Sequence, residues 1–178
     1  MSRGLFARDP LAGTEALIRR VYAYVAYRLG EGPEAEDVTS DVFERALRYR
    51  ESYHRSKGEP IAWLLGIARR CADTALAARV DIPANLVEAG SNGNVEDDAL
   101  RRLSLAAALA ELGDRDRELV ALRFGADLTA AQIAEVVGSR TNAVEVALHR
   151  ALARLRASLS DEAEVEPAHE VAAAPRRR

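Results

Sequence analysis

The feature that most constrains the fold is a glycine between two amphipathic segments in the last third of the chain. Residues 129–137 repeat apolar side chains at helical spacing, and Thr129 with Gln132 forms the pattern of a capping box at their start. Gly138 then acts as a stop signal, and after a short turn apolar residues recur at three- and four-residue steps as far as Leu159. The pattern predicts two helices around a tight turn, the second long and amphipathic, as in a helix-turn-helix.

The rest of the chain is also patterned for helices. Apolar stripes run through residues 17–29, 33–48, 60–79 and 99–125, and the second of these predicts that Leu47 is buried. Three Phe, one Trp and five Tyr leave few aromatic residues for strands, whereas Ala, Leu, Arg and Glu are frequent. We therefore predict an all-α protein with two small helical domains joined by a flexible linker, the C-terminal domain containing the helix-turn-helix.

The distribution of charge supports this division. The net charge of −3 taken alone argues against a nucleic-acid binder, but residues 1–79 and residues 99–159 each carry +2. The excess of acidic residues lies in residues 80–98, with a net charge of −5, and in residues 160–178, with a net charge of −2. Residues 80–98 contain Pro83 and the run Gly90 to Asn94 and lack a sustained apolar period, so they are predicted to be a linker. Residues 160–178 cannot supply a packed face and are predicted to be a disordered tail.

Several classes of function are disfavoured by what the chain contains. No apolar run has the length of a signal peptide or a membrane span, so we expect a cytoplasmic protein with no membrane insertion. The single cysteine, Cys71, cannot form an internal disulfide or a metal site alone, and we expect a buried thiol rather than a redox sensor. His54, His149 and His169 lie far apart, and no glycine-rich phosphate loop is present. We therefore expect a protein that is not an enzyme and has no metal or cofactor.

The second block carries a specific resemblance. The stretch LGDRDRELVALRFGADLTAAQIAEVVGSRTNAVEVALHRALARLR resembles the promoter-reading C-terminal domain of the extracytoplasmic-function (ECF) sigma factors of bacterial RNA polymerase. The matching positions are Leu112 to Arg117, Leu122 to Phe124, Ile133 to Glu135, Gly138, Val144 and Leu148 to Ala151.

The first block independently resembles the other conserved domain of the same family. AEDVTSDVFERAL is similar to the helix that docks on the polymerase clamp, and PIAWLLGIARRCADTAL is similar to the helix beside the melted upstream promoter element. The resemblance implies a region 2-like domain in residues 1–79 for core polymerase and the −10 element, and a region 4-like domain in residues 99–159 for the −35 element.

The implied function is that of a sigma factor, which directs RNA polymerase core to specific promoters for transcription initiation. The implied partners are core polymerase, promoter DNA and an inhibitory anti-sigma factor of the kind such factors commonly have. Two alternatives stay open. One is a sigma-mimicking adaptor that titrates a regulator, and the other is a helix-turn-helix transcriptional regulator that binds a palindrome as a dimer without core polymerase.

The resemblance also assigns a polymerase-binding face to residues 33–48. Its members are Asp37, Asp41, Glu44, Arg45 and Arg48. Alternatively this is a solvated helix face held by pairs at four-residue spacing, Asp41 with Arg45 and Glu44 with Arg48. Ser40 stands where the family usually has Gln.

The candidate DNA-binding residues of the first domain lie in a polar loop and the helix after it. They are Tyr53, Arg55, Lys57, Trp63, Arg69 and Arg70. Aromatic faces and arginine planes stack on unpaired bases, and the cations neutralise phosphate. Trp63 has an alternative role as a core residue of an apolar helix, and Arg70 stands where the family often has Asn.

The candidate DNA-binding residues of the second domain begin the last helix. Arg140, Thr141, Asn142 and Glu145 are placed to read bases, and His149, Arg150 and Arg154 follow, the two arginines within reach of phosphate. Relatives commonly carry Lys or Arg at the position of Glu145. A carboxylate there can accept a hydrogen bond from the amino group of cytosine. The alternative is that Glu145 only stabilises the positive end of its helix and pairs with His149.

Overall fold

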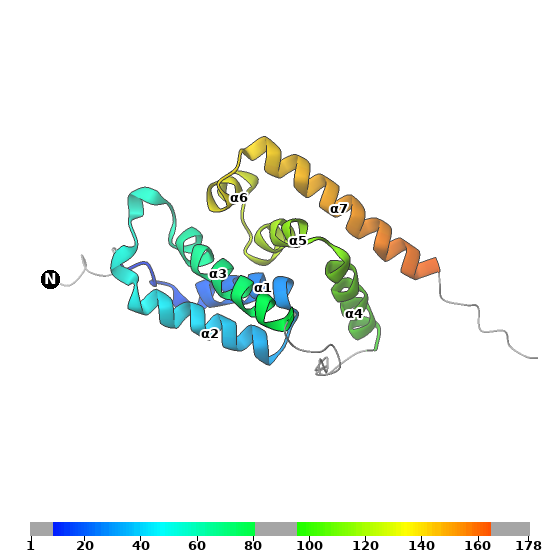
Figure 1. Ribbon diagram of the computed structural model, residues 1–178, viewed down its shortest axis with the longest axis horizontal. Helices are drawn as coiled ribbons and strands as arrows, with labels where there is room; N and C mark the ends of the chain where they lie inside the picture. Colours follow the sequence, from blue (N-terminus) through cyan, green and yellow to red (C-terminus); the bar gives the residue numbers. More distant parts are fainter. Residues whose placement is uncertain (1–8, 81–95, 165–178) are drawn as a thin grey trace, which may run out of the picture.

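The computed structural model describes residues 9–80 and 96–164 of the chain. Within these two ranges all regular elements are helical, as the sequence predicts (Figure 1). The first range contains α1 (Thr14–Leu29), α2 (Pro33–Arg48), the short turns η2 (Arg50–Ser52) and η3 (Arg55–Lys57), and α3 (Pro60–Val80). The second range contains α4 (Glu96–Glu111), α5 (Asp114–Val120), the π-helical turn η5 (Ala121–Gly125), α6 (Ala130–Val137) and α7 (Thr141–Glu164).

The helices extend into both segments that the sequence assigns to linker and tail. Helix α3 continues through Val80 and α4 begins at Glu96, so both ends of the predicted linker are helical. Helix α7 continues to Glu164, so residues 160–164 are helical rather than part of the tail. The rest of the predicted linker, 81–95, and of the predicted tail, 165–178, lies outside the described residues.

The local signals read from the sequence explain where the helices of the second half begin and end. Thr129 accepts a hydrogen bond from the backbone N–H of Gln132, and the Gln132 side chain accepts one from the backbone N–H of Thr129, which is the predicted capping box. Gly138 ends α6 in a left-handed conformation with φ of 66°, which a side chain with a Cβ adopts only at a cost. Helix α6 therefore ends at the predicted glycine, and the chain changes direction there before α7 begins at Thr141.

The first three helices pack together around a common core. Helix α2 buries Val38, Val42 and Ala46 against α1 and α3. Leu47, which the sequence predicted to be buried, is 57% exposed. The reason is that Leu47 follows Ala46 by one residue, which rotates its side chain about 100° around the helix and away from α1 and α3.

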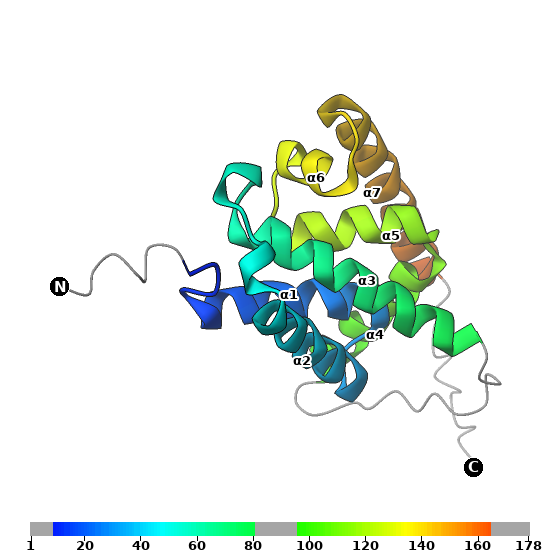
Figure 2. The ribbon, with the colours of Figure 1, turned by 60° about the vertical axis from the view of Figure 1, so that its left-hand side comes forward.

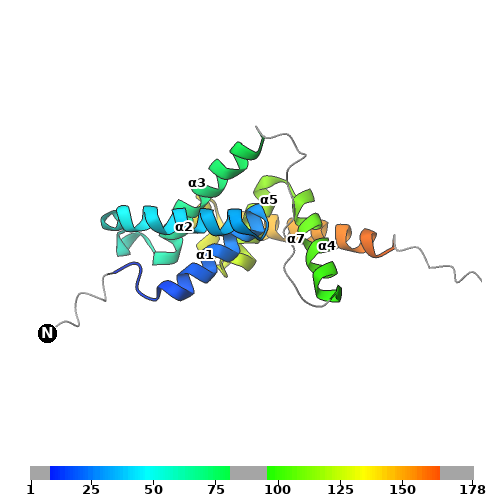
Figure 3. The ribbon, with the colours of Figure 1, turned by 90° about the horizontal axis from the view of Figure 1, so that it is seen from below.

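In the second half, α7 lies across α4, α5 and α6 and extends beyond them, so that its end and α2 occupy opposite ends of the molecule (Figure 1 and Figure 3). Its apolar stripe is buried at Val144, Leu148 and Ala151. This long contact holds the helix-turn-helix on the α4–α5 pair.

The two halves also contact each other extensively. Helix α1 packs against α5 and η5, and α3 packs against α6 (Figure 2). Buried residues of both halves, including Tyr24, Leu64, Leu122 and Ile133, form one continuous apolar cluster. In the described arrangement the two predicted domains therefore share a core across their interface.

Candidate nucleic-acid interface

The start of α7 presents the predicted base-reading side chains to solvent. We call this surface the α7 face, and it comprises Arg140, Thr141, Asn142, Glu145, His149 and Arg150, all of which are exposed. They are exposed because Val144 and Leu148, on the opposite face of the same helix, are buried against the rest of the second half. The structure therefore brings six of the seven predicted residues together on one accessible surface.

The seventh residue, Arg154, is positioned differently. Its guanidinium forms an ion pair with the carboxylate of Asp116 on α5, although its side chain stays 66% exposed. No sequence pattern connects these two residues, which lie 38 positions apart. A phosphate would have to compete with Asp116 for Arg154.

Glu145 is not paired in the way that its alternative role requires. Among the residues that the structure describes, no hydrogen bond or ion pair joins Glu145 to His149. The Glu145 carboxylate faces solvent near the positive end of α7, where the helix dipole favours a negative charge. It is thus available to accept a hydrogen bond from outside the protein.

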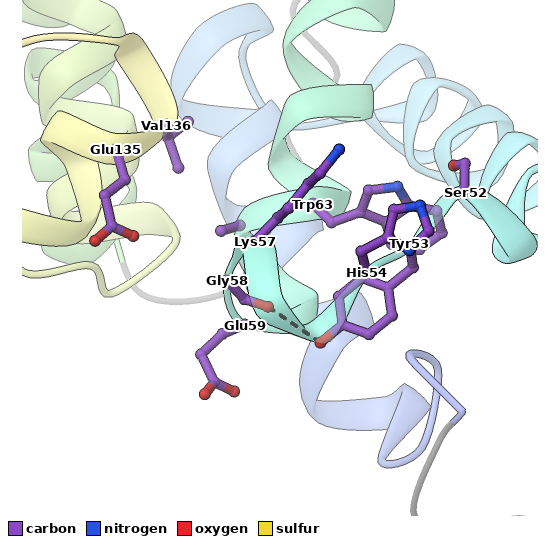
Figure 4. A pocket seen from close by; sticks show the side chains of 10 residues that line it. Ser52, Tyr53, His54, Lys57, Gly58, Glu59, Trp63, Glu135 and Val136 are labelled. Atoms are coloured by element: carbon purple, nitrogen blue, oxygen red, sulfur yellow. Dashed lines mark hydrogen bonds between the residues drawn. The ribbon is translucent and has the colours of Figure 1, made fainter.

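The second candidate surface lies between the η2–η3 loop and the start of α3. A shallow cavity of about 220 Å³ is lined there by Tyr53, His54, Lys57 and Trp63, among others (Figure 4). The Tyr53 and Trp63 rings lie 5.6 Å apart at 57°, and the Tyr53 hydroxyl donates to the Gly58 carbonyl at 3.1 Å. The loop is thereby held against the helix with two aromatic rings at the cavity.

Trp63 combines both roles that the sequence left open. It is half-buried and packs against the shared core, and it also lines this cavity. Arg55 and Lys57 on η3 are exposed, as is Arg70 on α3. Of these cations Lys57 lines the cavity, beside the rings of Tyr53 and Trp63, and a cation next to aromatic rings is a combination that can bind an unstacked base. We call the cavity, its aromatic residues and Arg69 the α3 site.

Arg69 is the predicted DNA-binding residue whose surroundings differ most from expectation. Its Nε donates to Glu118 Oε1 of α5 at 2.5 Å, and its NH1 donates to the Val136 carbonyl of α6 at 3.0 Å. Burial opposes the charged form, but the hydrogen bond and charge of Glu118 outweigh it, so the pKa of Arg69 lies above its ordinary value. Arg69 is therefore fully charged and already bonded within the chain.

The residues that the sequence reasoning missed are those that approach the α3 site from the second half. Glu118 pairs with Arg69, and Glu135 and Val136 of α6 line the cavity opposite the loop (Figure 4). Each belongs to an ordinary amphipathic helix, so no local signal in the sequence marks it.

The predicted polymerase-binding face lies along the exposed side of α2. Asp37, Asp41, Glu44 and Arg48 are exposed and Arg45 is partly exposed. Both predicted pairs are present, with 3.9 Å between Arg45 and Asp41 and 2.7 Å between Arg48 and Glu44. Leu47 and Tyr49, both more than half exposed, add apolar surface at the end of the same helix. An exposed charged face with apolar side chains at one end is suited to a protein partner.

The described residues contain neither a cluster suited to a metal ion nor a helix suited to span a membrane. In residues 9–80 and 96–164, no three side chains of His, Cys, Asp or Glu are grouped to hold a metal ion. Over the same residues, no helix is both apolar enough and long enough to span a bilayer. Cys71 is buried, as predicted, and burial raises the pKa of its thiol.

Family models match both halves of the chain. The sigma-70 region 2 model matches residues 14–80, and the sigma-70 region 4 model matches residues 102–155. The two regions therefore occur in one chain and in this order.

Curated relatives are similar to this chain over most of its length. The ECF RNA polymerase sigma factor BldN of Streptomyces coelicolor is 35% identical over 151 residues, covering 80% of this chain and 57% of BldN. SigD of Mycobacterium tuberculosis is 35% identical over 76% of this chain and 70% of SigD. SigK of Mycobacterium ulcerans is 27% identical over 77% of this chain and 78% of SigK. The chain thus spans little more than half of BldN but over two thirds of SigD and SigK.

Two solved structures share the fold. The sigma factor RpoE in complex with the anti-sigma factor NepR from Bartonella quintana has a TM-score of 0.69 at 19% identity, covering 87% of this chain and 96% of that chain. CnrH in complex with the cytosolic domain of CnrY has a TM-score of 0.59 at 22% identity, covering 85% and 86%. At these identities the similarity concerns the fold alone.

Proposed function

The chain belongs to the ECF RNA polymerase sigma factors, and we propose that it directs RNA polymerase core to specific promoters for transcription initiation. The observation that carries this proposal is the presence of region 2 and region 4 in one chain, each with an exposed surface of suitable chemistry. The protein would act by binding in the cytoplasm, where the polymerase works, without catalysing covalent chemistry itself.

The proposed division of labour follows the two halves. Residues 1–79 would bind the polymerase through the exposed face of α2, with Leu47 and Tyr49 supplying apolar contact beside its charges. They would also capture the −10 element at the α3 site. Residues 99–159 would read the −35 element, and residues 80–98 would connect the two.

Reading of the −35 element would use the α7 face. The N-terminal part of a recognition helix contacts base edges in the major groove, and cations farther along reach phosphate. Asn142 can pair with adenine, Arg140 with guanine and Glu145 with the amino group of cytosine. Arg150 is exposed and would bind phosphate, whereas Arg154 would first have to leave Asp116.

An inhibitory partner belongs to the proposal as well. Two solved structures of the same fold are complexes: the sigma factor RpoE with the anti-sigma factor NepR, and CnrH with the cytosolic domain of CnrY. We infer that this chain is also held inactive by an anti-sigma factor until a signal releases it.

Run-off transcription with purified core polymerase tests the proposed function. The protein is mixed with core enzyme and a library of promoter fragments, and the transcripts are sequenced. We expect transcripts that depend on the added protein and share an upstream element. Stable core binding without any transcript would favour the sigma-mimicking adaptor, and DNA binding without core binding would favour a helix-turn-helix regulator.

A further inference from the structure

We propose that Val146 is a base-reading residue of α7 and that it recognises the C5-methyl group of a thymine in the −35 element. This inference rests on the proposed function, because it concerns the DNA that the α7 face would read. It goes further by adding a side chain that has neither charge nor hydrogen-bonding group, and by naming the base that such a side chain selects.

The first observation is that Val146 lies in the middle of the α7 face. Side chains three or four positions apart are neighbours on a helix surface, so Val146 adjoins Asn142 in one direction along α7. In the other direction it adjoins His149 and Arg150, and all four side chains are exposed. Val144 lies instead on the buried stripe of the same helix. A duplex that contacts the polar residues of the α7 face therefore also contacts Val146.

The second observation is that packing within the chain does not account for this side chain. Val146 is 43% exposed and belongs to neither of the two apolar clusters formed by the described residues. A β-branched residue also forms helix less readily than alanine, because its χ1 angle is restricted in a helix. Valine at this position thus neither fills the core nor favours the helix, and its apolar surface is available to a ligand.

The third observation is that the neighbours of Val146 leave the space in front of it open. Ala143, one turn earlier, is exposed, and Ala147 follows directly and is partly buried. Neither of these side chains extends beyond its Cβ, so the two methyl groups of Val146 project farther from the helix axis than both. The edge of a base pair can therefore approach Val146 without first meeting a longer side chain at these two positions.

The chemistry of the major groove decides which base fits this side chain. Thymine presents a methyl group there, whereas adenine, guanine and cytosine present only hydrogen-bond donors and acceptors. Val146 gains by covering a methyl group, because apolar surface is removed from water. It loses by covering a donor or acceptor that water would otherwise satisfy. The side chain therefore favours thymine and disfavours the amino groups of cytosine and adenine.

The adjacent residue, Glu145, has the opposite requirement. Its carboxylate accepts a hydrogen bond from the amino group of cytosine and gains nothing from a methyl group. Val146 also makes no contact with phosphate through its side chain, so its contribution to binding should not depend on salt concentration. The α7 face would thus select bases by an apolar contact as well as by hydrogen bonds.

The test removes one methyl group at a time from the DNA. Core polymerase with the full chain selects duplexes from a promoter library randomised in the −35 element. In the selected duplex each thymine of that element is then replaced singly by deoxyuridine, which lacks only the C5-methyl group. Dissociation constants are measured by fluorescence anisotropy for the unaltered protein, for Val146→Ala and for Leu103→Ala. The last is the control, because it shortens another exposed apolar side chain, on α4.

We expect one thymine at which deoxyuridine weakens binding of the unaltered protein about fourfold, the effect of losing one buried methyl-sized group. The same replacement should change binding of Val146→Ala little, because the side chain that covers the methyl group is already shortened. Leu103→Ala should respond as the unaltered protein does. The slope of log affinity against log salt concentration should be equal in all three proteins. Circular dichroism checks that helicity is kept.

Equal losses in the unaltered protein and in Val146→Ala would overturn the inference, as would an element in which no thymine responds to removal of its methyl group. Selection that enriches no element would overturn it too. Run-off transcription judges the proposed function separately. If transcripts appear but no thymine responds, the sigma-factor function stands and Val146 reads no base. If no transcripts appear, duplexes selected by the protein alone receive the same replacements, and the response of Val146→Ala decides its role without polymerase.

Discussion

The start of α7 and the start of α3 both carry cations and polar side chains assigned to DNA, but the fold leaves one surface accessible and occupies the other. On the α7 face, Arg140, Asn142 and Glu145 point to solvent. At the α3 site, Arg69 is 30% exposed and bonded to Glu118, and α6 lines the cavity. The same residue types on similar helices are therefore accessible or not according to which other segments of the chain pack against them.

The two surfaces differ in accessibility because α7 and α3 have different numbers of packing neighbours. Helix α7 lies at one edge of the second half and buries one stripe, so its opposite face has no neighbour in the described part of the chain. Helix α3 lies between α2 and α1 on one side and α6 on the other, so most of its surface meets protein. Duplex reading by α7 is therefore compatible with the described arrangement, whereas strand capture by α3 requires it to change.

The largest expected effect tests the shared core itself. Leu122→Ala removes a fully buried side chain from the cluster that both halves contribute to, and we expect a loss of about 2–5 kcal/mol in the free energy of unfolding. Because η5 packs against α1, hydrogen exchange in α1 should accelerate along with exchange in α5. Acceleration confined to the second half would show that the halves unfold independently. It would then count against packing between the halves as the cause of the difference between the two surfaces. Leu103→Ala, at a position 55% exposed, is the control.

The next effect concerns the accessible surface. Glu145→Ala should relax the preference for one cytosine in the −35 element by about 1–3 kcal/mol, because the carboxylate that accepts a hydrogen bond from the amino group of cytosine is lost. Glu145→Lys should raise affinity for all duplexes. It should also steepen the slope of log affinity against log salt concentration by about one, as expected for one added phosphate contact. Selection from a randomised promoter library, with binding titrated at several salt concentrations, measures both. An unchanged preference at every position of the element would leave Glu145 as a charge that only stabilises the helix.

A smaller effect is expected at the interface between the halves. Tyr24→Phe removes a buried hydroxyl that has no hydrogen-bond partner among the described residues, so we expect it to stabilise the packing of the two halves by up to about 1 kcal/mol. Thermal unfolding measures the gain in stability. Slower modification of Arg69 by phenylglyoxal would show that the gain arises at the interface between the halves. Tyr22→Phe, on the same helix and only partly buried, is the matched control. Destabilisation by Tyr24→Phe would mean that the hydroxyl has a partner in solution.

Alkaline pH should weaken the fold through two groups near the core. Burial raises the pKa of both Tyr24 and Cys71, so in the folded state each keeps its proton to higher pH than in the unfolded state. Stability is then complete below about pH 8, the lower of the two unfolded pKa values being about 8.5, and declines as pH rises above it. Urea titrations at several pH values measure the decline. Cys71→Ser should remove the earlier part of it, and an unaltered profile in that variant would exclude the thiol.

The smallest change in stability is expected on α2. Reversing both charges of the Asp41–Arg45 pair should change the free energy of unfolding by no more than about 0.5 kcal/mol, because exposed pairs at this spacing contribute little. Binding to core polymerase should weaken by more than that amount if the face is an interface. Core affinity is measured by competition with a labelled sigma factor, and reversal of Glu15 and Arg19 on α1 is the control. Equal core affinity in both variants would leave the α2 face merely solvated.

Much of the architecture follows from local sequence signals. The period of apolar residues, the Thr129–Gln132 capping box and the left-handed Gly138 depend on neighbours within one helical turn, and the structure contains them where they were predicted. The α7 face was predictable for the same reason, since a helix that buries one stripe exposes the other. Leu47 marks the limit of such reasoning, because one step around the helix separates burial from exposure.

Which of the predicted residues are accessible depends on contacts between distant segments of the chain. Arg69 meets Glu118 across 49 residues, Arg154 meets Asp116 across 38, and Gly125 lies against Ala23 on a helix about a hundred residues earlier in the chain. No periodicity or cap reports such pairs, since each partner sits in a helix that would form without the other. They arise because the apolar faces of α1, α3, η5 and α6 are buried together, and that packing brings charges of distant segments into contact.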